Sequence, residues 1–283
     1  MNRFGLIGHP IAHSLSPALF KAAYNGKYTY DLIEEEDFDK AYERFLKEYD
    51  AINVTAPFKE QAFRKADTGN NDCQAIGAAN ILHKDETDGV VSAYNSDVDG
   101  VTGALAPYRK TGVKPPKALI VGCGGAAMAA AYATWHHMGY DTFIINRNAA
   151  KAQEFVDRLK SKGHTHGIHA AGLDSFAEMF RQADIIIYNL PVAISAIEAL
   201  SRKDIRGAAF WQQSQEKVIL EANYKNPTFT SELIEKMRKV NPRLKYVSGK
   251  EWLLHQAVGA YRIFTGKEPD IEAMRKVFQE TQD

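Results

Sequence analysis

The segment Gly122-Cys123-Gly124-Gly125-Ala126 constrains the fold more than any other part of this sequence. It follows an apolar run at 118–121 and opens an alanine-rich stretch that continues to Met138, which predicts a strand, a tight turn and a helix in succession. Glycines allow the backbone to turn tightly and approach a pyrophosphate, and the free amides at the start of a helix stabilise its negative charge. We therefore expect a Rossmann-like dinucleotide-binding domain around this turn.

Strand and helix patterns alternate along the rest of the chain. Apolar runs predict strands at 3–8, 29–34, 51–54, 142–145, 184–188 and 218–222, and longer patterned segments predict helices at 17–25, 37–48, 149–162, 230–240 and 249–265. This alternation is typical of an α/β fold with mainly parallel sheets. With 283 residues, 45% of them hydrophobic, the chain is long enough for two such domains.

The domain boundary is predicted from a break in this pattern. A helix expected at 98–108 is followed by Lys114-Pro115-Pro116-Lys117, where two adjacent prolines interrupt regular structure. We place an N-terminal α/β substrate domain at 1–100 and the Rossmann-like domain at 101–245. The helix at 249–265 is long and uncharged on one side, so we expect the segment 246–283 to pack back on the first domain.

Composition excludes several classes of protein. The 35 basic and 35 acidic residues balance, which argues against binding to nucleic acid or to an anionic membrane. The two cysteines, Cys73 and Cys123, lie far apart and indicate neither a disulfide framework nor a zinc cluster, so a cytoplasmic location is expected. No apolar run approaches the length of a membrane span. The histidines at 164, 166 and 169 are interpreted as part of a solvated turn rather than a metal site.

The second strand of the dinucleotide-binding domain ends in Asn146-Arg147 and carries no carboxylate there. An Asp or Glu at this place holds the ribose of NAD, whereas an arginine can pair with the 2′-phosphate of NADP. Lys151, one turn later, adds a second positive charge. The sequence therefore favours NADP, while ordinary surface charges remain the alternative interpretation of both residues.

Lys59 and Asp97 are the predicted proton-transfer pair. A lysine beside a carboxylate in a partly enclosed site can exchange a proton with an alcohol as hydride leaves its carbon. Taken alone, a lysine and an aspartate in such positions are more often a surface charge and a helix cap. Their significance comes from the motifs that contain them, Asn53-Val54-Thr55-Ala56-Pro57-Phe58-Lys59 and Asn95-Ser96-Asp97.

Three further motifs accompany this pair. They are Ser14-Leu15-Ser16-Pro17, Gly77-Ala78-Ala79-Asn80 and Gly249…Gln256-Ala257. In the first, serine before proline predicts a helix start at which Ser16 caps the free amides. Together with the glycine turn, the five motifs span nearly the whole chain and resemble those of the shikimate dehydrogenase family.

This resemblance implies a fold, a reaction and a set of site residues. The reaction is the reversible, NADPH-dependent reduction of 3-dehydroshikimate to shikimate in chorismate and aromatic amino acid biosynthesis, and it needs no metal. Lys59 and Asp97 would be the catalytic pair. The small-molecule substrate would be bound by Ser14, Ser16, Thr55, Asn80, Tyr224 and Gln256. The NADP site would be formed by Gly122, Gly124, Gly125, Ala126, Asn146, Arg147, Lys151 and Gly249.

The sequence also departs from the family pattern in places. These are 189–194, the segment 210–217, Glu221 where the family has aspartate, and Trp252 where it usually has methionine. A quinate/shikimate dehydrogenase or a related polyol dehydrogenase is therefore kept as an alternative, as is a non-catalytic binding protein of the same fold. Either a monomer or a homodimer is compatible with the sequence.

Overall fold

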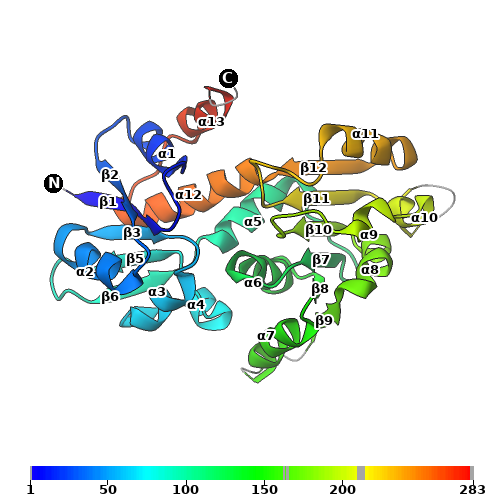
Figure 1. Cartoon of the computed structure of the whole chain (residues 1–283), viewed down its shortest axis with the longest axis horizontal. Coiled ribbons are helices and arrows are strands. Elements are labelled where there is room, and N and C mark those ends of the chain that lie inside the picture. Colours follow the sequence, from blue (N-terminus) through cyan, green and yellow to red (C-terminus); the bar gives the residue numbers. More distant parts are fainter. Residues whose placement is uncertain (1, 162, 164–165, 209–213, 281–283) are drawn as a thin grey trace. The chain divides into compact units, whose positions relative to one another are not determined.

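The computed structural model describes residues 2–161, 163, 166–208 and 214–280. The chain divides into two compact units, Met1–Gly100 with Leu253–Asp283, and Val101–Trp252. Each unit is built around its own six-stranded sheet (Figure 1). The predicted α/β fold class is confirmed.

The first unit holds a mixed sheet with the strand order β2-β1-β3-β5-β6-β4. Strand β5 is antiparallel to both β3 and β6, and the other neighbouring strands are parallel. The strands are β1 (Arg3–Gly8), β2 (Thr29–Glu34), β3 (Ala51–Val54), β4 (Thr68–Gly69), β5 (Ile81–Lys84) and β6 (Val91–Tyr94). The helices are α1 (Ser16–Ala23), α2 (Phe38–Glu48), α3 (Lys59–Lys65), α4 (Asn71–Ile76), most of α12 (Gly249–Thr265) and α13 (Ile271–Glu280).

Helices cover both faces of this first sheet. On one face, Phe38 and Phe45 of α2 pack against Ile7 and Ile52 of the sheet. On the other face, side chains of α1, α12 and α13 surround Phe4, whose ring stacks on that of Phe264 at a centroid distance of 5.1 Å. The C-terminal helices therefore return to the first unit, as predicted from the apolar side of α12 (Figure 1).

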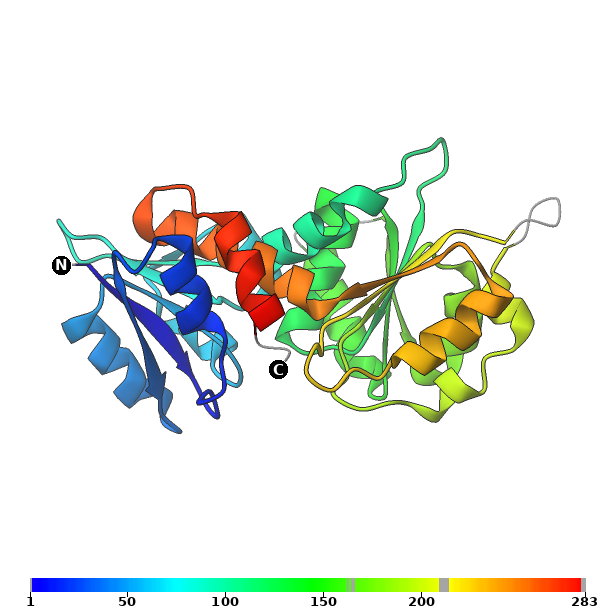
Figure 2. The same cartoon turned by 90° about the horizontal axis from the view of Figure 1, so that it is seen from above.

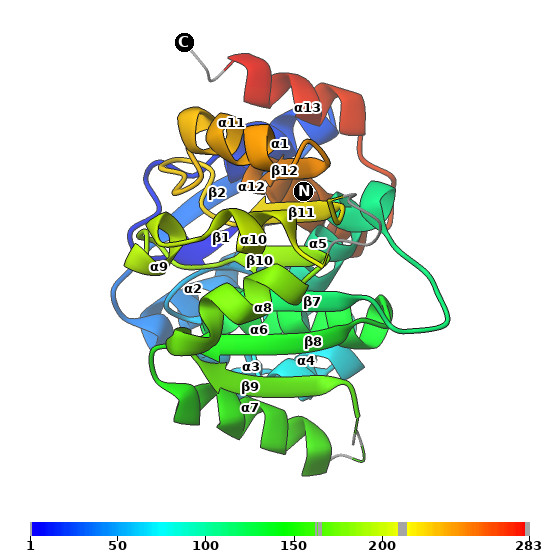
Figure 3. The ribbon, with the colours of Figure 1, turned by 90° about the vertical axis from the view of Figure 1, so that its right-hand side faces the viewer.

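The second unit holds a parallel sheet with the order β12-β11-β10-β7-β8-β9, which Figure 3 shows in full. Helices lie on both sides of it (Figure 2). Its strands are β7 (Lys117–Val121), β8 (Asp141–Asn146), β9 (Ile168–Gly172), β10 (Ile185–Tyr188), β11 (Lys217–Glu221) and β12 (Leu244–Ser248). Its α-helices include most of α5 (Asp97–Leu105), then α6 (Gly125–Tyr132), α7 (Ala149–Ser161), α8 (Phe176–Gln182), α9 (Ser195–Glu198), α10 (Arg202–Arg206) and α11 (Ser231–Val240).

Three short helical turns complete this unit: η1 (Ala106–Tyr108), the π-helical η2 (Ala133–His137) and η3 (Leu173–Ser175). The helix predicted after the glycine turn is thus α-helical only to Tyr132 and continues as a π turn. Thr134 lies in this turn, fully buried, and its hydroxyl donates to the carbonyl oxygen of Ala130 at 2.9 Å. A serine or threonine that bonds back to the helix backbone in this way can distort the helix.

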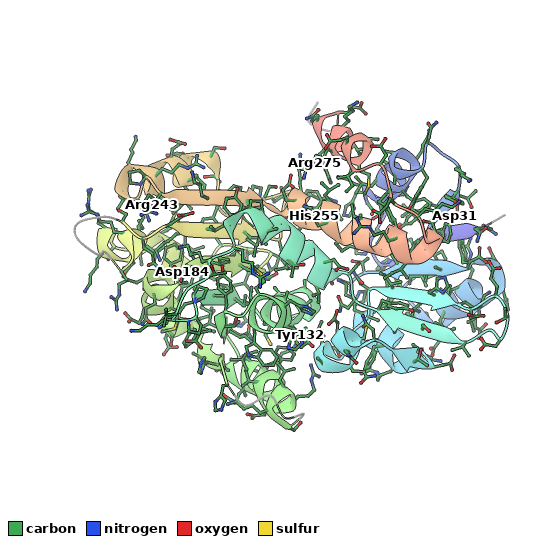
Figure 4. The ribbon with its side chains drawn as sticks, turned by 180° about the vertical axis from the view of Figure 1, so that it is seen from behind. Asp31, Tyr132, Asp184, Arg243, His255 and Arg275 are labelled. Atoms are coloured by element: carbon green, nitrogen blue, oxygen red, sulfur yellow. The ribbon has the colours of Figure 1, made fainter. Side chains whose placement is uncertain are left out.

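Lys217, the first residue of β11, is a fully buried lysine. Its Nζ donates to the carbonyl oxygens of Phe180, Arg181 and Ala183 at 2.7, 3.0 and 2.8 Å, which closes the carboxyl end of α8. Burial lowers the pKa of Lys217 to about 7, although nearby Asp184 opposes this shift. Asp184 (labelled in Figure 4) directly precedes β10 and accepts from the backbone amide of Lys117 in β7 at 2.9 Å. Together, these contacts connect the starts of β7, β10 and β11 with the end of α8.

We expect Lys217→Met to lower the free energy of unfolding by about 2 kcal/mol, because it leaves buried carbonyl groups without a donor. The loss should grow as pH rises from about 7 toward about 10, the range in which the folded lysine is neutral and the unfolded one still binds a proton. Urea unfolding at pH 7 and pH 9.5 measures both effects. Exposed Lys245→Met on β12 is the control. A loss that stays constant with pH would contradict the lowered pKa.

Candidate active site

Polar side chains of the first unit gather at one edge of its sheet. Strands β3 and β6 end at this edge, and β5, which is antiparallel to both, begins there. The register pairs Asn53 with Ile81 and Ile81 with Tyr94, so the residues that follow β3 and β6 lie beside the residue that precedes β5. Asn80 and Asp97 are brought together in this way.

Lys59 and Asp97 are in direct contact. The distance from Lys59 Nζ to Asp97 Oδ2 is 2.5 Å, and the two side chains are 18% and 9% exposed. Each is the first residue of a helix, α3 for the lysine and α5 for the aspartate. Backbone hydrogen bonds also fix both residues. The carbonyl oxygen of Lys59 accepts from the amide of Ala79 at 2.9 Å, and the amide of Asp97 donates to Asn95 Oδ1 at 3.2 Å. Such a pair can give or take a proton at a bound alcohol oxygen.

Ser96 joins two of the predicted substrate-binding amides. Nδ2 of Asn80 and Nε2 of Gln256 both donate to its Oγ, at 3.1 and 3.2 Å, and its own amide donates to Asn80 Oδ1 at 2.8 Å. Sequence reasoning missed this residue, although it occupies the middle of the Asn95-x-Asp97 motif. Asn80 is thus held at both ends of its amide and keeps one Nδ2 hydrogen for a ligand, whereas Gln256 is held in this network through Nε2 and keeps its Oε1 as well.

Ser14 and Ser16 lie after β1, at the start of α1. The amide of Ser16 donates to Ser14 Oγ at 3.2 Å, and the two hydroxyl oxygens are 3.1 Å apart. The prediction that Ser16 caps this helix is wrong, because Leu15 is the capping residue and it makes no side-chain bond. The two hydroxyls are thus paired with each other instead. The carbonyl oxygen of Ser16 is tied to α12, where the hydroxyl of Tyr261 donates to it at 3.1 Å.

Thr55 follows β3 and is half-buried beside the end of β1. Its amide donates to the carbonyl oxygen of Ile7 at 2.9 Å. Its methyl group packs so closely on Gly8 that a Cβ there would overlap it. This close approach requires glycine at position 8, and it fixes the threonine at the same edge of the sheet.

The glycine turn of the second unit follows β7 at the carboxyl edge of the sheet. From β7 the chain continues to β8 and β9 on one side and returns to β10 on the other, so the turn lies at the point where the strand order reverses. Ligands of open α/β sheets bind at such points. Gly122 has φ +110°, and a Cβ there would lie 3.2 Å from Leu190 Cδ2. A side chain is therefore unfavourable at this position both for backbone conformation and for space.

The start of α6 suits an anionic group. Gly124 is the capping residue and supplies no side-chain acceptor, and the first helical bond is made by the amide of Met128 at 2.9 Å. The preceding amides of the helix are left for solvent or a ligand. Space around Gly124 is open, with nothing within 4 Å of an added Cβ. Nearby, Asn189 Oδ1 is a buried acceptor without a donor among the described residues. The free amides and the open space fit a dinucleotide phosphate at the turn, whereas the Asn189 oxygen would accept a hydrogen bond from a donor group of the ligand.

The predicted selectors of NADP lie at the end of β8. Arg147 and Lys151 are both exposed, and neither forms an ion pair within the described part of the chain. Asn146 is half-buried and its Nδ2 donates to the carbonyl oxygen of Asn148 at 3.0 Å, which shapes the loop that carries Arg147. Two unpaired cations one helical turn apart are suited to a phosphate monoester.

Tyr224 and Gly249 both belong to the second unit, and Gly249 packs on the end of β11, where the loop that carries Tyr224 begins. Tyr224 is in the loop after β11, and burial raises the pKa of its hydroxyl. Gly249 begins α12 and packs against the carbonyl groups of Glu221 and Ala222 so closely that a Cβ would overlap them. Glycine is therefore required where this helix meets the start of the Tyr224 loop.

The histidine segment gives no support for a metal site. His164 lies outside the described residues, and His169 Nε2 is 2.8 Å from Asp141 Oδ1. Among the residues that the structure describes, no group of three or more His, Cys, Asp or Glu side chains is placed to hold a metal ion.

Within the described residues, no helix is both long and apolar enough to cross a membrane.

Taken together, the parallel sheet with its glycine turn and the lysine–aspartate cluster define an α/β protein of the dinucleotide-dependent dehydrogenase class. Three family models match the chain: the shikimate dehydrogenase substrate binding domain at residues 6–82, shikimate / quinate 5-dehydrogenase at 104–220, and the shikimate 5′-dehydrogenase C-terminal domain at 253–277. The chain belongs to the shikimate dehydrogenase family.

Individual relatives agree with this assignment. Shikimate dehydrogenase (NADP(+)) of Methanothermobacter thermautotrophicus is 32% identical over 280 residues, covering 95% of this chain and 93% of the relative. The corresponding enzyme of Methanocaldococcus jannaschii is 31% identical and covers 96% and 94%. Among solved structures, Mycobacterium tuberculosis shikimate dehydrogenase is 28% identical with a TM-score of 0.79 over 99% of this chain and 100% of the other. The Thermus thermophilus enzyme in complex with NADP(H) and shikimate is 25% identical with a TM-score of 0.77, and 99% of each chain is covered.

Proposed function

We propose that this protein catalyses the reversible, NADPH-dependent reduction of 3-dehydroshikimate to shikimate. The observation that carries the proposal is the 2.5 Å contact between Lys59 and Asp97, beside amides that are oriented by Ser96. Relatives named as NADP-dependent shikimate dehydrogenases match nearly the full length of the chain and support it. We further propose a cytoplasmic location, for which the two free, buried cysteines are the supporting observation. We propose a monomer or a homodimer as the oligomeric state.

In this proposal, polar groups of the first unit orient the substrate. The hydroxyls of Ser14 and Ser16 bind its carboxylate, and Thr55, Asn80 and Gln256 bind its ring hydroxyls. The network around Ser96 suits this role, because it fixes both amides before a ligand arrives. A site that bonds several hydroxyls discriminates strongly against analogues that lack one, since its buried polar groups are then left unpaired. Tyr224 of the second unit is the remaining proposed substrate contact.

Lys59 is proposed to move the proton. During reduction its ammonium group donates a proton to the carbonyl oxygen of the substrate as the carbon receives hydride, and during oxidation the neutral amine takes that proton back. Asp97 holds the lysine in place and stabilises its positive charge. A bound nicotinamide supplies or accepts the hydride. The carbonyl thus gains one hydride and one proton and becomes the alcohol, with no other reactant.

The cofactor is proposed to bind in the second unit. The amides of Gly124, Gly125 and Ala126 would hold the pyrophosphate, and Gly122 would allow the backbone to approach it. Asn146, Arg147 and Lys151 would hold the adenosine end with its 2′-phosphate, and Gly249 would lie beside the nicotinamide. The open space at Gly124 and the two exposed cations without ion pairs support this arrangement.

Initial rates of nicotinamide absorbance change test the proposal directly. Purified protein is assayed with shikimate or quinate and with NADP or NAD, in all four pairings. We expect rapid reduction with shikimate and NADP, and rates at least about tenfold lower in the other pairings, because a hydroxyl or phosphate contact is then mismatched. Faster turnover of quinate would instead favour the polyol dehydrogenase alternative. No turnover in any pairing, with shikimate still bound in calorimetry, would favour a binding protein.

A further inference from the structure

Glu221 is a buried carboxylate that the proposed reaction leaves unused. It ends β11 in the second unit and is 0% exposed. No ion pair with a cation is present for it among the described residues. Burying a charge is costly unless hydrogen bonds compensate for the lost water, so its contacts must account for its presence.

Three donors surround this carboxylate. The backbone amides of Thr228 and Phe229 donate to Oε1 and Oε2 at 2.5 and 3.1 Å. The hydroxyl of Tyr246 on β12 donates to Oε2 at 3.2 Å. Burial and the charge of Glu221 both raise the pKa of Tyr246, so this hydroxyl keeps its proton and remains a donor at neutral pH. Charge-assisted bonds of this kind are stronger than bonds between neutral groups.

The two backbone bonds close the loop that carries Tyr224. The loop leaves the sheet directly after Glu221, and the carboxylate binds it again where it returns, at Thr228 and Phe229. Within the loop, Asn223 Nδ2 donates to the carbonyl oxygen of Asn226 at 2.8 Å, and the amide of Asn226 donates back to Asn223 Oδ1 at 3.2 Å. The described contacts therefore hold the loop at its base and in its middle.

Two further contacts hold the loop near the end of β11. The ring of Phe229, which is 1% exposed, packs edge-on against Tyr188 of β10 at a centroid distance of 5.5 Å. Gly249 packs on the carbonyl groups of Glu221 and Ala222. The base of the loop thus contacts the end of β10 and the start of α12. The first residue of α12, Gly249, is one that we assign to the cofactor site.

We propose that Glu221 is a positioning residue, whose carboxylate clamps the loop 222–229 and thereby sets the place of Tyr224 within the second unit. This inference rests on the proposed function, in which Tyr224 contacts the substrate. The Glu221 carboxylate is buried and bonded to three protein donors. Its effect on catalysis is transmitted through the loop backbone.

The first test is Glu221→Gln, which keeps the size of the side chain but places an amide donor among three donors. We expect the KM for shikimate to rise about tenfold while kcat changes less than about threefold. Hydrogen exchange at the amides of Thr228 and Phe229 should become at least about tenfold faster. A KM and an exchange rate that both stay at the wild-type values would overturn the proposal.

Tyr246→Phe is the matched control. It removes the third donor to the same carboxylate, from β12, and leaves both loop amides bonded. We expect a lower melting temperature with the KM for shikimate within twofold of wild type. A purely structural role for Glu221 would give the same KM in the two variants, and that result would count against a clamp on the loop.

A double-mutant cycle with Tyr224→Phe tests whether Glu221 acts through Tyr224. If it does, Glu221→Gln should raise KM less than twofold further once the Tyr224 hydroxyl is absent, because coupled residues are not additive. Independent, multiplying effects would overturn the proposed route. Should Glu221→Gln fail to fold, Glu221→Leu removes the acceptor for both loop amides without placing a buried donor there, and the same two readouts apply.

The outcome for Glu221 can be separated from the outcome for the proposed function. A wild-type protein that does not oxidise shikimate would overturn the function, and the exchange rates at Thr228 and Phe229 would still decide whether Glu221 clamps the loop. An active wild type with unchanged variants would overturn only the role of Glu221.

Discussion

Lys59→Ala is expected to reduce kcat for shikimate oxidation about 10³-fold, within the range that a positioned proton-transfer group usually contributes. The dissociation constant for shikimate should change less than about threefold. The substitution removes the ammonium group that is 2.5 Å from Asp97, but it leaves the serine hydroxyls and the Asn80–Ser96–Gln256 network in place. Binding and turnover should therefore separate, which is the kinetic sign of a group that acts mainly in the transition state.

The measurement is initial-rate kinetics with NADP, combined with calorimetric binding of shikimate to each variant. Lys65→Ala is the control, because Lys65 ends the same helix but is paired with Asp39 at 3.0 Å and not with Asp97. It should keep the wild-type kcat. A Lys59 variant that loses shikimate binding but keeps kcat would show that the lysine anchors the substrate and does not move the proton.

Arg147→Ala is expected to raise the KM for NADPH about 30- to 100-fold and the KM for NADH less than about threefold. A charge-assisted bond to a phosphate is worth about 2–3 kcal/mol, and only NADPH carries the 2′-phosphate. Arg147 is exposed and has no ion pair to lose in the described structure, so its removal should leave the fold intact. The resulting variant should discriminate far less between the two cofactors.

Steady-state kinetics with both reduced cofactors measures this change. Arg243→Ala is the control (Figure 4), because this arginine is similarly accessible but pairs with Glu216 at 3.3 Å on another part of the unit. It should affect neither KM. Equal losses for NADPH and NADH would mean that Arg147 supports the adenosine moiety generally, for example by stacking on the base, and does not select the phosphate.

Much of the fold could be predicted from local patterns in the sequence. The strands at 3–8, 29–34 and 51–54 were predicted with the bounds that the structure gives them, because apolar runs between turn residues are a local signal. Strands β4, β5, β6, β9 and β12 were missed. Several are short and only partly apolar, and their pairing partners lie elsewhere in the chain, so the sequence pattern alone does not define them.

The candidate site shows the same division. Lys59, Asn80 and Asp97 were singled out by motifs, and the structure places Lys59 against Asp97. The physical reason for their proximity, an antiparallel β5 that begins where β3 and β6 end, could not be predicted, because strand direction depends on long-range pairing. Ser96 was missed because its contacts involve a residue 160 positions later, Gln256, and short motifs carry no information on such distances.

The return of α12 to the first sheet has a consequence for protein synthesis. The apolar layer on one face of that sheet, around Phe4 of β1 and Phe20 of α1, is covered by residues 254–264 and 274–278. These residues leave the ribosome only after the whole of Val101–Trp252 has been made, roughly ten seconds or more after the first sheet at usual rates of elongation. For that period the nascent N-terminal segment carries an uncovered aromatic surface. We therefore expect chaperones to bind this surface during translation. Chains that terminate before residue 254 should aggregate, because the surface then stays uncovered.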